Sequence, residues 1–510
     1  MALFQSVLTL LMLAVLLLRA SRHLRIPYPT MLAMAGLIVA TLPFAPDLSI
    51  DPHLALVLFI APAILDAAFD FPLRAIRRYW LPLVALAAVA VLLTTAAVAW
   101  AGVAFAGMPM AAAVALGAIV SPPDAAAAAA MLNRPGLPYS TAMVLKGESL
   151  LNDAVALFIF GVAMRISASG GEVYHALPQL ALAIPGGILL GIVSGRLAIF
   201  VLPFLTETLG GILFQFIATF STWVVAEQLG WSAILAVVAA AMTIAQRDEQ
   251  QSARDRLHSN AVWSVVVFVL NVLAFLFVGL EARSIVLGLS GEELRHAARF
   301  AFLVLAIVIV VRIVWVMLYN RLAQPLYRWL NYGPGPSVKQ GIVASWCGMR
   351  GMVTLAAALA LPTSFPQRGL VVLSALTVVL GTLVLQGITL GPLIGLLKFP
   401  KDASRDEEIL RARTLLATAA MDALGDRDDD IAQAIRHELQ ADLTGSTMAV
   451  RDIGGIDALR IDLIRTERET LRDMRRQGNI DEEVFRALEQ ELDLREVAAM
   501  RRNSFELVDN

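Results

Sequence analysis

The stretch from Lys146 to Ala154 places acidic and polar side chains inside a segment that is otherwise apolar enough to dissolve in lipid. An uncompensated ionised residue at the centre of a bilayer costs about 2.5–3.5 kcal/mol on insertion scales, so a buried charge there is expected to face protein, water or an ion. We therefore interpret Asp153, the last acid of the stretch, as a site for a cation.

Helical spacing predicts that further oxygen atoms lie near Asp153. Residues four apart share a helix face, which pairs Ser149 with Asp153 and Glu148 with Asn152. A dehydrated monovalent cation prefers hard oxygen ligands such as carboxylate and hydroxyl groups. Burial disfavours the charged form of a carboxylic acid, so we expect Asp153 to accept a proton as well. Competition between the two ions for one carboxylate predicts obligatory exchange.

Two other charged residues are expected at the same depth in the membrane. If a helix begins near Thr141, Asp153 lies roughly 18 Å along it, close to the midplane of the bilayer. Asp124 and Arg350 fall near the middle of two other apolar runs. We expect Arg350 to pair with Glu148 as a structural ion pair, because either charge would be costly alone.

Both of these runs contain helix-breaking residues. Prolines remove backbone donors and interrupt a helix, so the backbone of Ser121, Pro122 and Asp124 is predicted to open and to supply further ligands. Gly348 and Gly351 lie on either side of Arg350 and are predicted to interrupt the second run. Matched interruptions in two halves of a chain are typical of inverted-repeat transporters that bind ions at the midplane. The alternative is that proline and glycine are simply frequent in membrane helices.

Three further charges are interpreted as peripheral. Asp66 either lines a funnel that leads to the site or is a solvated acid near a helix end. Glu227 and Arg312 are interpreted as charges at the membrane boundary.

The composition identifies the class of protein. Of 510 residues, 58% are hydrophobic and only 16% are charged, with a mean hydropathy of +0.72. Apolar runs of about 17–25 residues are long enough to cross the bilayer as helices. Thirteen such runs are predicted, near 3–18, 29–45, 53–69, 81–106, 109–130, 141–165, 177–204, 208–227, 231–246, 261–281, 299–320, 340–361 and 369–396.

The charge distribution divides the chain into two domains and sets its orientation. Residues 401–510 hold 17 Lys/Arg and 26 Asp/Glu, whereas residues 1–400 carry a net charge of +7. Short loops on one side of the thirteen-span count hold most of the basic residues, which places that side in the cytoplasm. The N-terminus is then outside and the tail is cytoplasmic. Amphipathic helices are predicted in the tail at 406–424, 430–443 and 481–502.

Several function classes lack sequence support. Cys347 is the only cysteine, so no intrachain disulfide is possible. The sequence has no phosphate-binding loop and no dinucleotide fingerprint. We predict no enzymatic activity, no cofactor and no nucleic-acid partner.

At its polar motifs the chain resembles the monovalent cation:proton antiporters, in particular the electroneutral, sodium/hydrogen exchanger-like bacterial branch. Residues 147–153, Gly-Glu-Ser-Leu-Leu-Asn-Asp, are similar to that branch's most specific motif. The resemblance implies that Asp153 binds cation and proton and that Asn152 marks electroneutral exchange. Residues 121–124 resemble the Thr-Asp-Pro motif of the family's helix crossover, but Pro123 replaces the threonine, so which oxygen substitutes for it is open. Residues 345–351 resemble the stretch whose arginine, here Arg350, pairs with Glu148.

The sequence therefore predicts an all-α polytopic membrane protein of the bacterial plasma membrane. We expect about thirteen helices in two inverted repeats with two broken, crossing helices, and a helical, regulatory cytoplasmic tail. The resemblance implies a homodimer and a core that moves as an elevator. The expected function is antiport of Na+, or of K+ or Li+, against H+, in the service of cytoplasmic pH and cation balance. A cation channel and a transport-inactive sensor are the alternatives.

Overall fold

The computed structural model describes the two halves of the chain unequally. It describes residues 12–13, 15–20, 31–32, 35–36, 52–69, 71–124, 138–168, 177–205, 209–246, 259, 261–274, 290–329, 335–399, 404–425, 433, 436–437, 440, 463–474, 476–477, 488, 492 and 494–496.

The described residues form helices and no strand, and the chain divides into two compact units, Met1–Pro400 and Lys401–Asn510. The second unit contains helix α18, Ser404–Leu424, where the sequence predicts a helix at 406–424. A further helical stretch at 463–474, which the sequence analysis missed, is joined to the end of the unit by an ion pair of 2.6 Å between Arg468 and Glu496. The other two helices predicted in the tail lie mostly outside the described residues.

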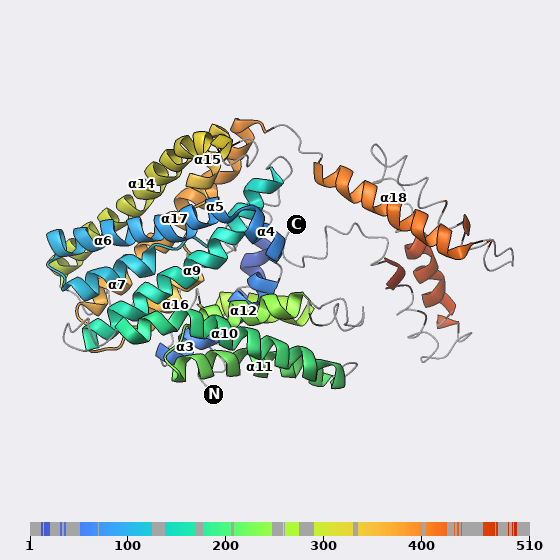
Figure 1. Ribbon diagram of the computed structural model, residues 1–510, viewed down its shortest axis with the longest axis horizontal. Helices are drawn as coiled ribbons and strands as arrows, with labels where there is room; N and C mark the ends of the chain where they lie inside the picture. Colours follow the sequence, from blue (N-terminus) through green and yellow to red (C-terminus); the bar gives the residue numbers. More distant parts are fainter. Residues whose placement is uncertain are drawn as a thin grey trace. The chain divides into compact units, whose positions relative to one another are not determined.

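The helices of the first unit follow the apolar runs of the sequence (Figure 1). Every span predicted from residue 53 onward overlaps a described helix, whereas the spans predicted at 3–18 and 29–45 lie mostly outside the described residues. The helices are α3 Pro52–Phe69, α4 Leu73–Arg78, α5 Trp80–Leu83, η1 Val84–Val89, α6 Ala90–Ala106, α7 Met110–Val120, α9 Tyr139–Ala168, α10 Leu177–Val201, η2 Leu202–Phe204, α11 Leu209–Gln228, α12 Ala233–Ala245, α14 Gly291–Trp329, α15 Val338–Trp346, α16 Met352–Leu359 and α17 Arg368–Leu397.

Six of the described helices are long and apolar enough to cross a membrane. Shorter apolar helices, including α7, α12 and the helix Ala261–Ala274, lie between them. The chain is therefore a multi-pass membrane protein whose described part is helical, and the count of thirteen helices and the inverted repeats stay predictions. The six spans are Trp80–Ala106, Tyr139–Ser167, Leu182–Phe204, Gly210–Gln228, Gly291–Trp329 and Arg368–Leu397.

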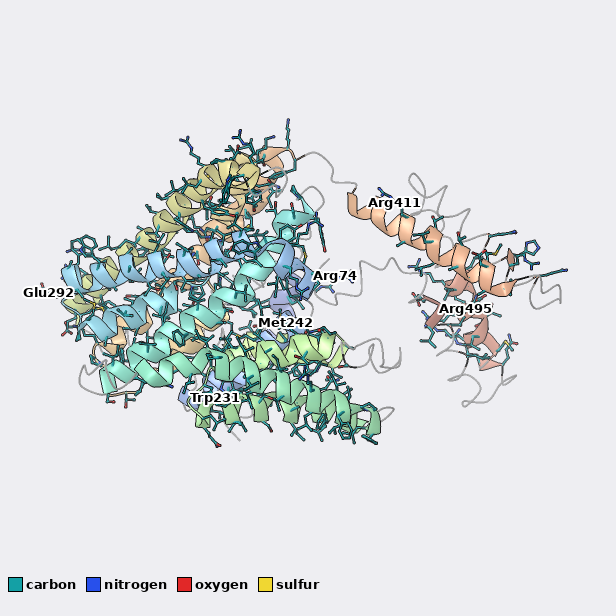
Figure 2. The ribbon with its side chains drawn as sticks, in the orientation of Figure 1. Arg74, Trp231, Met242, Glu292, Arg411 and Arg495 are labelled. Atoms are coloured by element: carbon teal, nitrogen blue, oxygen red, sulfur yellow. The ribbon has the colours of Figure 1, made fainter. Side chains whose placement is uncertain are left out.

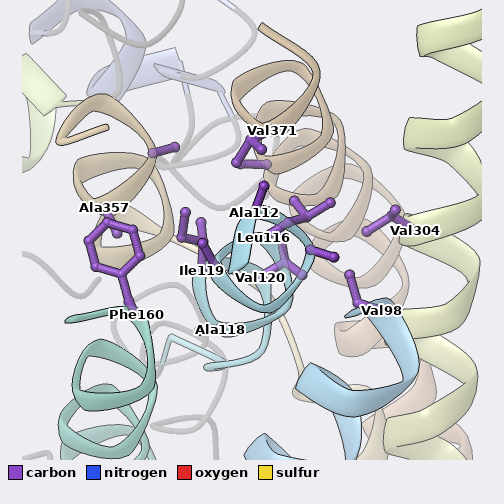
Figure 3. Close-up of a cluster of buried hydrophobic side chains, with 14 of the residues drawn as sticks. Val98, Ala112, Leu116, Ala118, Ile119, Val120, Phe160, Val304, Ala357 and Val371 are labelled. Carbon is purple, nitrogen blue, oxygen red and sulfur yellow. The ribbon is translucent and has the colours of Figure 1, made fainter. Parts of the chain in front are cut away.

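One group of helices surrounds α7, whose small and branched side chains allow close packing on every side. Helix α7 contacts α6, α9, α16 and α17, and α14 packs on α6 and α17. Figure 3 shows the resulting core, in which side chains of α7 meet those of its neighbours. The labelled members are Val98, Ala112, Leu116, Ala118, Ile119, Val120, Phe160, Val304, Ala357 and Val371.

A second group consists of α10, α11 and α12, which lie side by side (Figure 1). Helix α3 packs on α11 and α12 in this group and on α9 and α16 in the first. Helix α3 therefore joins the two groups, and in the first group it contacts α9, which carries the polar motif of residues 147–153.

Glycines bring α10 and α12 into backbone contact. Gly187, Gly191 and Gly195 recur every four residues on one face of α10, and small residues let membrane helices approach closely. A Cβ atom added at Gly191 would lie 2.2 Å from the carbonyl oxygen of Ala236 in α12. The backbone of α12 thus occupies the space that any larger side chain at this position requires.

Replacing Gly191 with alanine is expected to destabilise the protein by about 1–3 kcal/mol, because the two helices must separate. The midpoint of thermal unfolding in detergent measures the effect. Gly161→Ala in α9 is the matched control, since a Cβ atom there meets nothing within 4 Å. Equal midpoints for the two variants would contradict the close approach of α10 and α12.

Candidate functional site

Two helices are interrupted where the sequence predicts it. Helix α7 ends at Val120, and residues 121–124 that follow are not helical. Helix α15 ends at Trp346, and residues 347–351 separate it from α16. The open backbone at residues 121–124 and the interruption between α15 and α16 are confirmed, and both place helix-end backbone groups inside the first unit.

The two interruptions contact each other through Asp124. Its backbone N–H donates to the carbonyl oxygen of Met349 at 2.7 Å. Its Oδ2 accepts a hydrogen bond of 3.2 Å from the N–H of Met352, the first residue of α16. A carboxylate at this position complements the partial positive charge of a helix N-terminus. Asp124 therefore caps α16 from the other broken helix.

Arg350 binds the opposite kind of helix end, the C-terminal end of α7. Its Nε donates to the carbonyl oxygen of Val120 at 3.1 Å, and its Nη2 donates to that of Ser121 at 3.3 Å. A third bond runs from Nη1 to the carbonyl oxygen of Gly348. The residue is only 1% exposed. Its positive charge thus neutralises the C-terminal end of α7, where unpaired carbonyl groups carry partial negative charge.

Glycine is required where the interruptions meet. A Cβ atom at Gly351 would lie 1.6 Å from Oδ2 of Asp124. Any side chain there would expel the carboxylate from the end of α16. The glycine beside Arg350 therefore serves the approach of Asp124.

Asn152 connects helix α9 to the first interruption. Its Nδ2 donates to the carbonyl oxygen of Pro123 at 3.1 Å, and the residue is 0% exposed. Its Oδ1 has no hydrogen-bond partner among the described residues. Asn152 therefore ties α9 to the first interruption and holds the next residue, Asp153, beside it.

Asp153 differs from the other acids of the region. It is 9% exposed, and within the described part of the chain its carboxylate has no hydrogen bond and no ion pair. Ser149 lies one turn earlier on α9 and is half-buried. An isolated carboxylate inside a membrane protein requires a proton or a cation to offset its charge.

Glu148 has a different partner from the one that the sequence predicts. Its carboxylate accepts hydrogen bonds from Nη1 and Nη2 of Arg312, at 2.6 and 3.2 Å. Nη2 of Arg312 also donates to the carbonyl oxygen of Ala344 at 2.9 Å. The predicted pair of Glu148 with Arg350 is therefore wrong, because Arg350 is committed to the end of α7.

The interpretation of Arg312 as a boundary charge is also wrong, since the residue is 2% exposed in the interior of α14. The signal was present in the sequence. Arg312 lies within a predicted span, where an arginine needs a partner. Glu227 is exposed, as a boundary charge requires.

The remaining predicted site residues lie in the same unit. Pro122 is buried in the first interruption, and the hydroxyl of Ser121 donates to the carbonyl oxygen of Ala118 at 3.0 Å. Asp66 is half-buried in α3, which packs on α9. A ligand role for these residues, and the funnel at Asp66, stay predictions. The sequence analysis missed Thr354 of α16, whose buried hydroxyl has no partner among the described residues.

Comparison with known proteins gives consistent matches. Residues 8–395 match the family described as sodium/hydrogen exchanger, transmembrane. An uncharacterized Na+/H+ exchanger of Mycobacterium tuberculosis is 30% identical over 501 residues, which cover 93% of this chain and 92% of the relative. The sodium, potassium, lithium and rubidium/H+ antiporter of Bacillus subtilis is 28% identical over 397 residues, which cover 72% of this chain and 57% of the relative.

A solved structure shares the fold. The sodium proton antiporter MjNhaP1 from Methanocaldococcus jannaschii at pH 8 superposes with a TM-score of 0.59 at 17% sequence identity. The match covers 78% of this chain and 99% of that chain.

Removing one member of the buried Glu148–Arg312 pair is expected to cost about 3–5 kcal/mol, because the other charge stays buried and unpaired. Arg312→Met should therefore lower the yield and unfolding midpoint of the protein. Combining it with Glu148→Gln should restore much of both, since neither charge remains. In contrast, combining Glu148→Gln with Arg350→Met should bring no recovery. Recovery in the second combination and not in the first would contradict the observed pairing.

Proposed function

The chain belongs to the sodium/hydrogen exchanger family, and from this premise we propose that it exchanges a monovalent cation for a proton at the carboxylate of Asp153. The matched family is described as sodium/hydrogen exchangers, which supports a transporter as the proposed class.

The observation that carries the proposal is the difference among three acids. Glu148 is neutralised by Arg312, and Asp124 accepts a hydrogen bond from the N-terminus of α16. Asp153 alone among these three has no such partner within the described residues. A buried carboxylate without a protein partner is stable when it binds a proton or a cation, so the two ions compete for it.

Neighbouring oxygens complete the proposed cation site. Ser149 lies on the same face of α9 as Asp153, and Oδ1 of Asn152 is buried and uncommitted among the described residues. The open backbone at Ser121 and Pro122 adds carbonyl groups close to Asn152 through its bond to Pro123. These are hard oxygen ligands of the kind that Na+, K+ and Li+ prefer. In this scheme Asp153 and Ser149 hold the ion only transiently.

The charge balance of the site favours electroneutral exchange. Asn152 is neutral, and the Glu148–Arg312 pair has no net charge. Asp153 is then the one carboxylate that alternates between the proton-bound and the cation-bound state. Each state neutralises it with a single positive charge, so exchange of one ion for the other moves no net charge.

Sodium is the proposed cation, with potassium and lithium as further substrates. The family description names sodium, and the Bacillus subtilis relative is named for sodium, potassium, lithium and rubidium. No cofactor is proposed. The physiological role that follows is control of cytoplasmic pH and cation content.

The setting that we propose is the bacterial inner membrane, with the N-terminus outside and the acidic tail in the cytoplasm. The multi-pass structure and bacterial relatives support the membrane location. Alternating access would move one group of helices against another. The first group surrounds α7 and includes α9 with Asp153, and the second consists of α10, α11 and α12. A homodimer and a regulatory role for residues 401–510 complete the proposal.

Asp153→Asn is expected to abolish exchange, because an amide neither binds a proton nor neutralises a cation. A sodium gradient should drive proton movement in vesicles containing the wild-type chain and not in vesicles containing the variant. Glu227→Gln in α11 is the matched control and should retain the wild-type rate. Retained exchange in a folded Asp153→Asn protein would overturn the proposed site. Flux driven by membrane potential alone would favour a channel.

Asn152→Asp should make exchange sensitive to membrane potential, since the site then carries a second carboxylate. The rate in vesicles is measured at one fixed potassium gradient with and without valinomycin, so that only the membrane potential differs between the two arms. The wild-type rate should not respond to the potential. A variant that is active and equally indifferent would contradict the role of Asn152 in charge balance.

A further inference from the structure

The short helix α4 presents three arginines on one face. Arg74, Arg77 and Arg78 are spaced so that they lie on the same side of a helix, and all three are exposed. Ala75, on the other side, is 7% exposed and belongs to the buried cluster formed with α3 and α9. We call the three arginines the arginine face.

The arginine face lies at the start of an apolar span. Trp80, two residues after Arg78, is the first residue of the span Trp80–Ala106 and is 47% exposed. The guanidinium carbon of Arg78 lies 5.7 Å from the ring centre of Tyr79. Tryptophan and tyrosine concentrate where the hydrocarbon of a membrane meets water. These aromatic residues therefore set the arginine face at the level of the lipid headgroups.

The segment just before the arginine face is in close contact with α9, the helix of the proposed exchange site. The ring of Phe71, two residues before α4, occupies the space beside Gly147 in α9. A Cβ atom added at this glycine would lie 2.5 Å from the ring. Figure 2 shows Arg74 at one end of the first unit and Glu292 at the other. The arginines thus occupy a defined position at one membrane surface.

We propose that the arginine face binds the headgroups of anionic phospholipids. The planar guanidinium group matches the geometry of a phosphate and binds it through two hydrogen bonds. Basic residues next to a membrane span attract the anionic lipids of the adjacent leaflet. Helix α4 itself has no acidic residue, so the charge that it contributes is positive. The position beside Trp80 favours a lipid over a soluble anion.

The test uses the purified full-length chain in detergent, titrated with phosphatidylglycerol or with phosphatidylcholine. Phosphatidylglycerol should raise the midpoint of thermal unfolding, and phosphatidylcholine should not. The triple variant Arg74→Gln, Arg77→Gln, Arg78→Gln should need on the order of a hundredfold more phosphatidylglycerol for the same rise, at about fivefold per arginine. The corresponding triple lysine variant should keep most of the response, because it retains the charge.

Arg295→Gln combined with Arg299→Gln is the matched control, since both arginines are exposed near the start of α14, at the end of the unit marked by Glu292. This control should respond to phosphatidylglycerol like the wild type. An unchanged response of the glutamine triple variant would overturn the proposal. So would an equal response of the wild type to phosphatidylcholine, or an equal rise with inorganic phosphate, which would identify a soluble anion as the ligand.

Discussion

The structure depends on two helix ends that lie inside an apolar unit. Each end is neutralised by a charged side chain from the segment that carries the other. A helix end carries roughly half an elementary charge, and inside a membrane no bulk water is present to solvate it. Arg350 of one interruption binds the carbonyl end of α7, and Asp124 of the other binds the N–H end of α16. These reciprocal contacts connect the end of α7 to the start of α16. They also leave open backbone at the crossing without a net charge.

This arrangement explains why one acid is chemically available. The crossing uses Asp124 and Arg350, and the second guanidinium, that of Arg312, binds Glu148. Asn152 attaches α9 to the crossing by its bond to Pro123. Asp124, Arg350, Arg312 and Glu148 are thus each assigned to a structural contact. The carboxylate of Asp153 remains as the group that we propose binds ions, next to Asn152 on α9.

Much of this could be predicted from the sequence, because membrane helices are identified by length and hydropathy and helix breaks by proline and glycine. The span 81–106 and the interruption at residues 121–124 illustrate both signals. Partner choice could not be predicted. Arg312 and Arg350 both lie in predicted spans, so the sequence allows either to pair with Glu148. Only the packing of α14 shows that Arg312 is the partner, because Arg350 binds the end of α7. The bond of Asp124 to Met352 likewise depends on how two distant segments cross.

Proton release on cation binding tests the central claim most directly. Purified protein is placed in weakly buffered solution below the pH at which Asp153 loses its proton, and sodium is added while the pH is recorded. Competition for one carboxylate predicts the release of about one proton per chain at saturation and none from Asp153→Asn. Sodium binding without proton release, or undiminished release from the variant, would contradict the account.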